Sequence, residues 1–329
     1  MREKGRVKFY NKETGFGFIK TKKGDVHFSR DSFKGEPPQE GDWVEFDVVI
    51  QSRCFHAKNI KIIFNKFLPD DTKKLLKHYP IENFNLKLNK FAYFEYFEDK
   101  FILFKKDKNM VAYKVTHEFN KKFFNNIVKS YYSKLKKINL NFEEVEMKLQ
   151  WRMIIGFGSP SVYETSMILH HIYGFPYIPA QAIKGVVRNY VIQEEFNCRE
   201  DDALKDKEFC DVFGGDSKSY YKQATKGEVI FFDAYPLDSP KIDIDVMNVH
   251  YKDYYDSKGE VPPADYQSPT PIYFLVVRDT RFKILLGSSQ KDLANYKIKE
   301  KNIIAWLQDA LYEHGVGAKT SIGYGVMES

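Results

Sequence analysis

Residues 150–195, QWRMIIGFGSPSVYETSMILHHIYGFPYIPAQAIKGVVRNYVIQEE, are typical of a strand, a glycine-rich loop and a helix, in that order. An apolar strand ends in Gly156-Phe157-Gly158, and the extended IPAQ leads into the helix AIKGVVRNYVIQ. Lys184 and Arg188 stand four residues apart, so both cations share one face near the start of this helix, where free amides also attract an anion. A phosphate backbone fits this pattern, and a surface helix with two solvated cations fits it equally well.

A second glycine-rich stretch, HGVGAKTSIGYGVM, covers residues 314–327. Its glycines, at 315, 317, 323 and 325, flank Lys319, Thr320 and Ser321. Glycine allows a close approach of backbone to ligand, hydroxyls and free amides bind phosphate, and lysine adds charge. The stretch therefore predicts a cradle for RNA. It lacks the glycine–lysine spacing and the following helix of a nucleotide-binding P-loop.

The first sixty-odd residues alternate short strands with turn residues. The expected strands are GRVKFYN, TGFGFIKT, GDVHFS, DWVEFDVVI and HAKNIKII. Five strands in so short a space predict a small closed barrel. Alternation places Lys8 and Tyr10 on one face, and Phe16 and Phe18 together on one face. Exposed rings beside lysines form a surface on which single-stranded bases stack.

Charge is distributed unevenly along the 329 residues, a length that suits two or three domains. Net charge is +4 over residues 1–64, +7 over 65–150 and −5 over 151–329. A basic first half suits a phosphate-rich partner, although a lysine-rich solvated surface gives the same count. Aromatic residues make up 16% of the chain, and most of them are expected in the core.

Residues 64–147 alternate lysine and aromatic clusters. EFNKKFFNNIVKSYYSKLKKI predicts a basic amphipathic helix, whose expected core stripe is Phe119, Phe123, Ile127, Tyr131 and Leu135. FAYFEYF and KFILFKK indicate a strand pair around EDK. Asp70-Asp71 and Thr72 could cap a short helix.

The cysteines, Cys54, Cys198 and Cys210, lie far apart and predict neither a disulfide framework nor a zinc site. No stretch approaches the roughly 20 apolar residues that span a bilayer, and no signal core is visible at the N-terminus. We expect a cytoplasmic protein with no membrane partner, no cofactor and no metal.

GRVKFYN, GFGFI and DVHFS together resemble the cold-shock domain family over residues 1–63. The resemblance implies an OB-type barrel with base-stacking rings at Phe9, Phe16, Phe18 and Phe28. It further implies polar contacts from Lys8 and His27, with Phe33 as a possible outer ring. An OB barrel kept for protein contacts is the alternative.

YIPAQAIKGVVR, residues 177–188, and the glycine-rich stretch resemble the RAMP superfamily of CRISPR effector subunits. The family implies an α+β, ferredoxin-like (RRM-like) body behind the barrel. We expect three regions: the barrel at 1–63, a basic linker and first part of the body at 64–149, and the RNA-binding body at 150–329.

PSVYETSMILHHIYGFPYIP, GEVIFFDAYPL, IDVMNVHYKDYY and YEHGVGAKTSIGYGVM further resemble the family of sixth Cmr subunits of type III-B systems. This implies a non-catalytic subunit that grips the 3′ portion of the crRNA and helps to position target RNA. The implied partners are crRNA, target RNA, other Cmr RAMP subunits and the small helical subunit. Expected RNA contacts of the body are Ser159, Tyr163, His170, Gln181, Lys184, Arg188, Lys319, Thr320 and Ser321.

Residues 248–270 are rich in Tyr, Lys and Pro and lie where backbone RAMP subunits carry a protruding β-thumb. By that resemblance, Tyr251, Lys252, Tyr254 and Tyr255 are expected near such a protrusion.

Cleavage by this chain is not expected. In the family's cutting subunits an aspartate follows the first strand, whereas residues 156–179 hold one acidic residue, Glu164, and no aspartate. His170 and His171 would point opposite ways on a strand, so at most one faces RNA, and His250 is similar. Asp243 and Asp245 would share a strand face as a solvated pair or anchor. The alternatives are a metal-independent ribonuclease using His170 or His171, and an assembly protein whose barrel contacts a neighbouring subunit.

Overall fold

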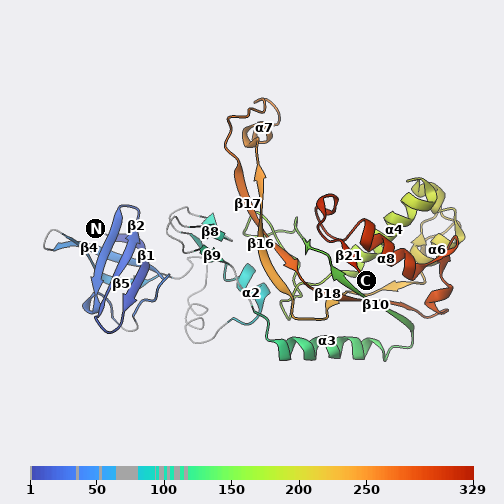
Figure 1. Cartoon of the computed structure of the whole chain (residues 1–329), viewed down its shortest axis with the longest axis horizontal. Helices are drawn as coiled ribbons and strands as arrows, with labels where there is room; N and C mark the ends of the chain where they lie inside the picture. Colours follow the sequence, from blue (N-terminus) through green and yellow to red (C-terminus); the bar gives the residue numbers. More distant parts are fainter. Residues whose placement is uncertain are drawn as a thin grey trace. The chain divides into compact units, whose positions relative to one another are not determined.

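A computed structural model describes residues 2–34, 37–51, 54–63, 81–92, 94–95, 100–101, 104–106, 112–114 and 118–329. The chain forms two compact units, which we describe separately (Figure 1). The first comprises residues 1–81 and 91–102, and the second comprises residues 82–90 and 103–329.

Five strands of the first unit close into a barrel in the order β1-β2-β3-β5-β4. Their bounds are β1 Arg2–Asn11, β2 Phe16–Thr21, β3 Gly24–Ser29, β4 Trp43–Gln51 and β5 Cys54–Ile62, and the short helix η1 spans Arg30–Ser32. Val7, Ile19 and Phe46 point inward and are buried. Closure leaves no sheet edge with unpaired backbone groups. The predicted five-stranded barrel is confirmed.

A register shift between Val7 and Phe9 changes which side chains of β1 face outward. Phe9 lies opposite Phe18 of β2, as a bulge of one extra residue requires. Tyr10 turns instead to the core, where its ring stacks on Phe28 at a centroid distance of 5.5 Å. The prediction that Lys8 and Tyr10 share a face is therefore wrong, because strict alternation does not survive the bulge.

Short strand pairs follow the barrel along the chain. β6 Phe94–Glu95 pairs with β7 Lys100–Phe101, which confirms the predicted strand pair around EDK. β8 Phe104–Lys106 pairs with β9 Ala112–Lys114 in the second unit. The predicted cap at residues 70–72 lies outside the described residues.

The body of the second unit is a mixed α/β fold, as predicted. Its main sheet has the order β14-β18-β10-β21, with β15 also paired to β18. The bounds are β10 Asn141–Leu149, β14 Ile230–Phe231, β15 Tyr235–Pro236, β18 Arg281–Ser288 and β21 Met327–Glu328. A second sheet, β11-β17-β16, joins β11 Arg152–Met153, β17 Thr270–Arg278 and β16 Lys241–Val249. The smaller pairs are β12 Gly214–Gly215 with β13 Thr225–Lys226, and β19 Lys297–Ile298 with β20 Lys301–Asn302.

Helices cover both faces of the main sheet (Figure 1). Ile284 and Leu286 of β18 pack in one core with α4 Ala180–Phe196 and α8 Ile303–Glu313, whereas Leu285 packs in another core with α3 Lys121–Leu135. This is the alternation of a strand buried on both sides. The shorter helices are α2 Phe84–Asn89, α5 Glu200–Ala203, α6 Lys207–Phe213, α7 Lys252–Asp256, η2 Leu293–Asn295 and η3 Thr320–Ile322.

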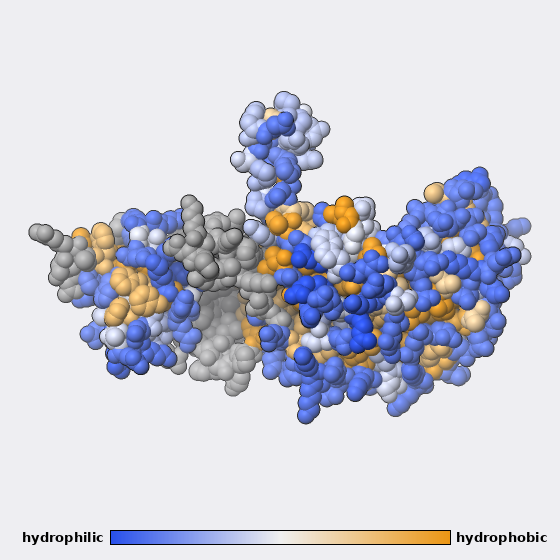
Figure 2. Space-filling view, viewed as in Figure 1, coloured by the Kyte–Doolittle hydropathy of each residue, from blue (hydrophilic) through white to orange (hydrophobic). Residues whose placement is uncertain are grey.

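The predicted basic helix is confirmed as α3, and most of its predicted core stripe packs against the core. The fully buried residues, Phe124, Val128 and Tyr132, are one position along from the expected set. Ile127, Tyr131 and Leu135 of the expected set are partly buried against them, whereas Phe123 is 56% exposed. Both sets have helical spacing, so periodicity alone could not choose between them. Its lysines lie on the exposed side of the helix, and Figure 2 shows this edge in hydrophilic colours.

β16 and β17 form a long hairpin that extends beyond the rest of the second unit and carries α7 near its tip (Figure 1). The pairing runs without a shift from Lys241 opposite Arg278 to Val249 opposite Thr270. In the described part of the chain, no helix has the length and apolar character needed to cross a membrane.

Candidate RNA interface

A hollow of about 400 Å³ opens between α4 and the glycine-rich loop, residues 314–325. Its lining is Gly185, Val186, Asn189, Glu313, His314, Gly315, Gly317, Thr320 and Ser321. A Cβ added to Gly185 would meet no atom within 4 Å, so the helix side of the hollow is open. The amide of Asn189 and the two hydroxyls supply neutral hydrogen-bond donors of the kind that bind phosphate oxygens. We call this hollow the loop pocket.

The glycines of the loop serve mainly to pass the chain close to other backbone. A Cβ on Gly317 would lie 2.1 Å from the Ile154 carbonyl oxygen, and one on Gly325 would lie 1.9 Å from the Val316 carbonyl oxygen. Backbone hydrogen bonds from Ala318 to Ile154 (2.9 Å) and from Gly325 to Arg152 (2.7 Å) hold the loop against β11. Gly323 differs, because nothing lies within 4 Å of its added Cβ. The sequence analysis predicted that these glycines let a ligand approach the backbone closely. Among the three, only Gly323 has the open space that this requires.

Lys319 begins η3 with a left-handed backbone (φ 59°). Its Nζ lies 5.9 Å from the ring centroid of Phe157, outside the lining of the loop pocket. Thr320 and Ser321, two of the predicted RNA contacts, line the loop pocket, and Ser321 is exposed.

The two cations of α4 have internal partners. Lys184 Nζ donates to the Phe213 carbonyl oxygen (3.0 Å), and burial, with the nearby charges of Arg188 and Lys226, lowers the pKa of this lysine. Arg188 pairs with Glu200 (2.7 Å) and lies 5.3 Å from the ring centroid of Phe209. Both point toward α5 and α6 and neither lines the loop pocket, whose helix side is Gly185, Val186 and Asn189.

The start of α4 already holds an anion. The Ala180 backbone amide donates to the carboxylate of Asp233 (2.8 Å), and Pro179 is the N-cap. A carboxylate at this position satisfies a free amide and the positive end of the helix dipole. The predicted phosphate position at the first turn is therefore taken by a side chain of the protein, which lies 53 residues further along the chain.

Ser159, Tyr163 and Gln181 are not brought together with the loop pocket. Ser159 is exposed in a turn closed by its amide on the Gly156 carbonyl oxygen (3.2 Å). Tyr163 is partly buried and packs on the main core, and Gln181 is exposed on α4.

His170 and His171 lie at a turn and not on the predicted strand, since the Gly174 amide closes the chain back on the His170 carbonyl oxygen (2.8 Å). His170 Nδ1 accepts from the amides of Ile172 (3.2 Å) and Tyr173 (3.3 Å). Its ring stacks on Tyr173 at 4.8 Å, and burial lowers its pKa, against the opposing charge of Asp233. His170 is thus a neutral side chain that stabilises its own turn, whereas His171 is exposed.

Asp243 and Asp245 form separate ion pairs. Asp243 contacts Arg278 Nε (3.2 Å), and Asp245 pairs with Arg152 and accepts from the Tyr324 hydroxyl (2.8 Å). Burial opposes ionisation of Asp245, but hydrogen bonds from Tyr324, the Val246 amide and Arg152 outweigh it and hold the pKa of this carboxyl below its ordinary value. Among the described residues, no group of three or more His, Cys, Asp or Glu could hold a metal ion.

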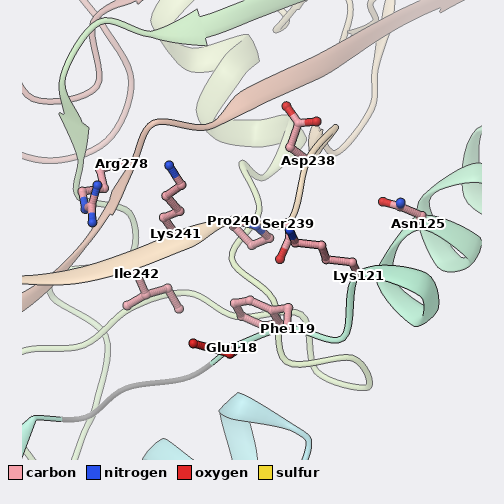
Figure 3. A pocket seen from close by; sticks show the side chains of 10 residues that line it. All are labelled: Glu118, Phe119, Lys121, Asn125, Asp238, Ser239, Pro240, Lys241, Ile242 and Arg278. Carbon is pink, nitrogen blue, oxygen red and sulfur yellow. The ribbon is translucent and has the colours of Figure 1, made fainter.

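Two larger hollows lie along α3 and share Asn125 and Asp238 in their linings. The first, of about 680 Å³, is shown in Figure 3, with Lys121 on the helix side and Lys241 and Arg278 on the strand side. Its charges are largely consumed by ion pairs: Lys241 and Arg278 contact Asp279, and Asp238 contacts Arg281. The larger volume of this hollow therefore does not make it a better candidate for the RNA site than the loop pocket.

The hairpin tip is rich in exposed rings. Tyr255 is 65% and Tyr266 is 89% exposed, and the rings of Tyr254 and Tyr255 meet at 5.4 Å. Lys252 pairs with Asp256, and Tyr251 donates to Asp265 (3.3 Å). Residues 250–268 hold two lysines and four carboxylates. A tip with net negative charge suits stacking on bases better than contact with phosphates.

The barrel presents a ring cluster on its outer surface. Phe9 and Phe16 are 39% and 37% exposed, and their rings lie 6.0 Å apart. Phe18 lies 5.6 Å from Phe9, and Lys8 pairs with Asp25 (2.7 Å).

His27 joins this cluster through Phe18, at a ring distance of 5.4 Å. Its Nδ1 lies 3.1 Å from His56 Nδ1, and burial together with His56 lowers the pKa of His27.

Phe28 does not belong to this surface. It is fully buried, because β3 pairs with β2 so that Phe28 lies opposite Gly17 and faces inward. A fully buried ring cannot stack on a base, so this assignment is corrected. Phe33 packs partly buried on the same core.

Sequence reasoning missed several side chains at these surfaces. Asn189 lies one turn beyond Gly185 on α4, and its helical spacing was the available signal. His56 meets His27 only through the parallel contact of β5 with β3, which no local pattern indicates. Trp151 and Tyr266 are 49% and 89% exposed and were not selected, although a large ring at a strand end or loop tip was visible.

Two family models match the chain. The RAMP superfamily model matches residues 146–328, and the 'Cold-shock' DNA-binding domain model matches residues 3–63. The barrel and the body thus each match a family of their own.

Individual relatives agree with this division. The chain is 35% identical to the CRISPR system Cmr subunit Cmr6 of Pyrococcus furiosus over 229 residues, which cover 55% of this chain and 66% of that protein, just under two thirds of its length. It is 47% identical to the cold shock-like protein CspC of Bacillus cereus over 62 residues, which cover 17% of this chain and 92% of that protein.

A solved structure, the type III-B Cmr-beta bound to cognate target RNA, contains a chain that is 25% identical, with a TM-score of 0.49. The match covers 64% of this chain and 66% of that chain.

Proposed function

The chain belongs to the RAMP superfamily, and from that membership we propose that it is a non-catalytic, RNA-binding subunit of a type III-B CRISPR (Cmr) ribonucleoprotein. Its similarity to a Cmr subunit over 55% of its length supports this assignment. The proposed role is to grip the 3′ portion of the crRNA and to help position target RNA. The proposed partners are both RNAs, the other Cmr RAMP subunits and the small helical subunit, in the cytoplasm.

The loop pocket carries the proposal. It gathers Asn189, Thr320 and Ser321, from segments more than a hundred residues apart, into one open hollow. Neutral donors on a rigid backbone bind phosphate and sugar oxygens with little dependence on base identity. We therefore place the crRNA backbone across this pocket, and not on Lys184 and Arg188, whose hydrogen bonds and ion pairs are internal.

The hairpin and the barrel each supply a separate RNA-binding surface in the proposal. The tyrosine-rich hairpin tip would separate or cap paired bases of guide and target. The ring cluster of Phe9, Phe16 and Phe18 would stack single-stranded RNA. The sequence match to a cold-shock domain model supports the second of these roles.

We propose that the chain does not cleave RNA, because His170 and Asp245 make hydrogen bonds and ion pairs within the protein. His170 commits its Nδ1 to two backbone amides of its own turn. Asp245 is held ionised by Arg152 and Tyr324. Asp245 is therefore not available as a general base, and the Nδ1 of His170 is not available to take a proton from RNA.

Asn189→Asp tests the loop pocket directly. It keeps the shape of the side chain and places a negative charge in the pocket, so the affinity of the full chain for a labelled single-stranded RNA should fall about tenfold or more. The measurement is a binding titration at fixed salt, with the RNA inspected for cleavage.

Gln290→Glu is the matched control, since it adds the same charge at an exposed position outside the pocket lining. Its affinity should stay within about twofold of the wild type. Equal weakening by both variants would remove the pocket from the proposal, and cut RNA in the wild-type sample would contradict the non-catalytic role.

A further inference from the structure

The three tryptophans of the chain differ sharply in exposure. Trp43 in the barrel and Trp306 on α8 are 5% and 3% exposed, whereas Trp151 is 49% exposed. Trp151 directly precedes β11, in the second unit. A half-open indole offers a large apolar surface with a π-face to a ligand, and its cost in conformational entropy on binding is small if the ring is already held.

The indole of Trp151 is held by two neighbours. The Tyr324 ring lies 4.7 Å from it, and the Arg152 guanidinium lies 5.3 Å from its centroid. Both neighbours bind the same carboxylate, because Tyr324 donates to Asp245 and Arg152 pairs with it. Burial and the Asp245 carboxylate raise the pKa of Tyr324 to about 12, so the phenol stays protonated and remains the donor.

The chemistry of this cluster favours a base over a phosphate. Arg152 and Asp245 neutralise each other, which leaves no free cation for a phosphate group. About half of the Trp151 side chain remains exposed beside these two neighbours, and stacking on an aromatic ring accepts any base.

The position of the cluster links two parts of the proposed RNA surface. Tyr324 belongs to the glycine-rich loop that contributes Thr320 and Ser321 to the loop pocket. Asp245 belongs to β16, in the lower half of the hairpin. Gly323, next to Tyr324, has open space beyond its Cα, and Ile322 is 64% exposed, so the loop surface beside the cluster is accessible.

We infer that Trp151 is a stacking site for one unpaired nucleobase of an RNA strand that passes between the loop pocket and the foot of the hairpin. The inference rests on the proposed RNA-binding function and adds a specific site to it. Tyr324 and Arg152 act as positioning residues that fix the indole, through their shared contact with Asp245.

Tryptophan fluorescence of the full chain tests the inference, because the other two indoles are buried. A titration with single-stranded RNA should quench the wild-type emission, and Trp151→Phe should lose most of that quenching while it retains most of the affinity. Trp151→Ala should weaken RNA binding by between about fivefold and a hundredfold, as measured with a labelled RNA.

Tyr312→Ala is the control, since Tyr312 is a 53% exposed ring on α8 outside the cluster, and its affinity should match that of the wild type. Undiminished quenching in Trp151→Phe, or wild-type affinity in Trp151→Ala, would overturn the inference. If Asn189→Asp still weakens binding in that case, only the stacking site fails. If the wild-type chain binds no RNA, the proposed function fails with it.

Discussion

Two regions beside α4 use their polar groups in opposite ways. One is the first turns of the helix with their cations, and the other is the glycine-rich loop, which faces Gly185 and Asn189. Lys184, Arg188 and the first amide of α4 are engaged by the Phe213 carbonyl oxygen, Glu200 and Asp233. Thr320 and Ser321, which carry no charge, line an open pocket with Asn189. Charged residues are costly to leave unpaired near a core, so a fold often provides them with partners of its own. A cation in a motif therefore indicates an RNA contact only once its partners are known.

The largest expected effect on stability comes from substitutions in the glycine-rich loop, at Gly325 and at Gly323, two residues apart. Gly325→Ala places a Cβ 1.9 Å from the Val316 carbonyl oxygen at φ +75°, so it should destabilise the second unit by about 3 kcal/mol or more and weaken RNA binding. Gly323→Ala meets only the cost of its positive φ, about 1 kcal/mol, because its surroundings are open. Denaturant unfolding measures both. Equal losses of stability would mean that the loop is not held as described.

The α4 cations should affect stability more than RNA affinity. Lys184→Met with Arg188→Met removes the hydrogen bond to Phe213 and the pair with Glu200, and should cost about 1 to 2 kcal/mol. Hydrogen exchange of the α4 and α6 amides measures this cost. RNA affinity should stay within about twofold. Ser321→Ala should show the reverse pattern, with unchanged exchange and weaker binding. A double methionine variant that keeps its stability and loses RNA binding would restore the sequence-based assignment.

The smallest expected effect concerns the pH dependence of the His170 turn. Burial holds the pKa of His170 below its ordinary value of 6.5, so the unfolded chain takes up a proton that the folded chain resists. The uneven proton uptake has no effect on the free energy of unfolding well above pH 6.5. It lowers that free energy as the pH falls through this value. Thermal unfolding at pH 7.5 and 5.5 should therefore show a smaller acid-induced fall in His170→Gln than in the wild type. An identical fall in both proteins would contradict the structural role of this imidazole.

Much of the fold follows from local sequence patterns. The five barrel strands, the basic helix α3 and the strand pair around EDK are each bounded by turn or capping residues that a reader of the sequence can see. What local patterns could not supply is the direction in which a side chain points. Phe28 faces inward because of its register with Gly17. The most deeply buried residues of α3 are one position along from the predicted stripe, which is equally periodic and is mostly half-buried.

The candidate site was harder to predict, because its decisive contacts are distant in sequence. The partners of Arg188, Lys184 and the first α4 amide lie 12, 29 and 53 residues away. The ring contact between Trp151 and Tyr324 likewise joins opposite ends of the body. Motif and resemblance correctly indicated the loop and the helix as elements of the fold, whereas the accessibility of each side chain required the tertiary structure.

Photocrosslinking of the full chain to a single-stranded RNA that carries photoreactive uridines tests the central claim most directly, namely that RNA lies across the loop pocket and not on the α4 cations. Peptides are then mapped by mass spectrometry. We predict adducts within residues 314–325 and at Trp151, with few or none at Lys184 and Arg188. Adducts concentrated at Lys184 and Arg188, with residues 314–325 unlabelled, would contradict the account.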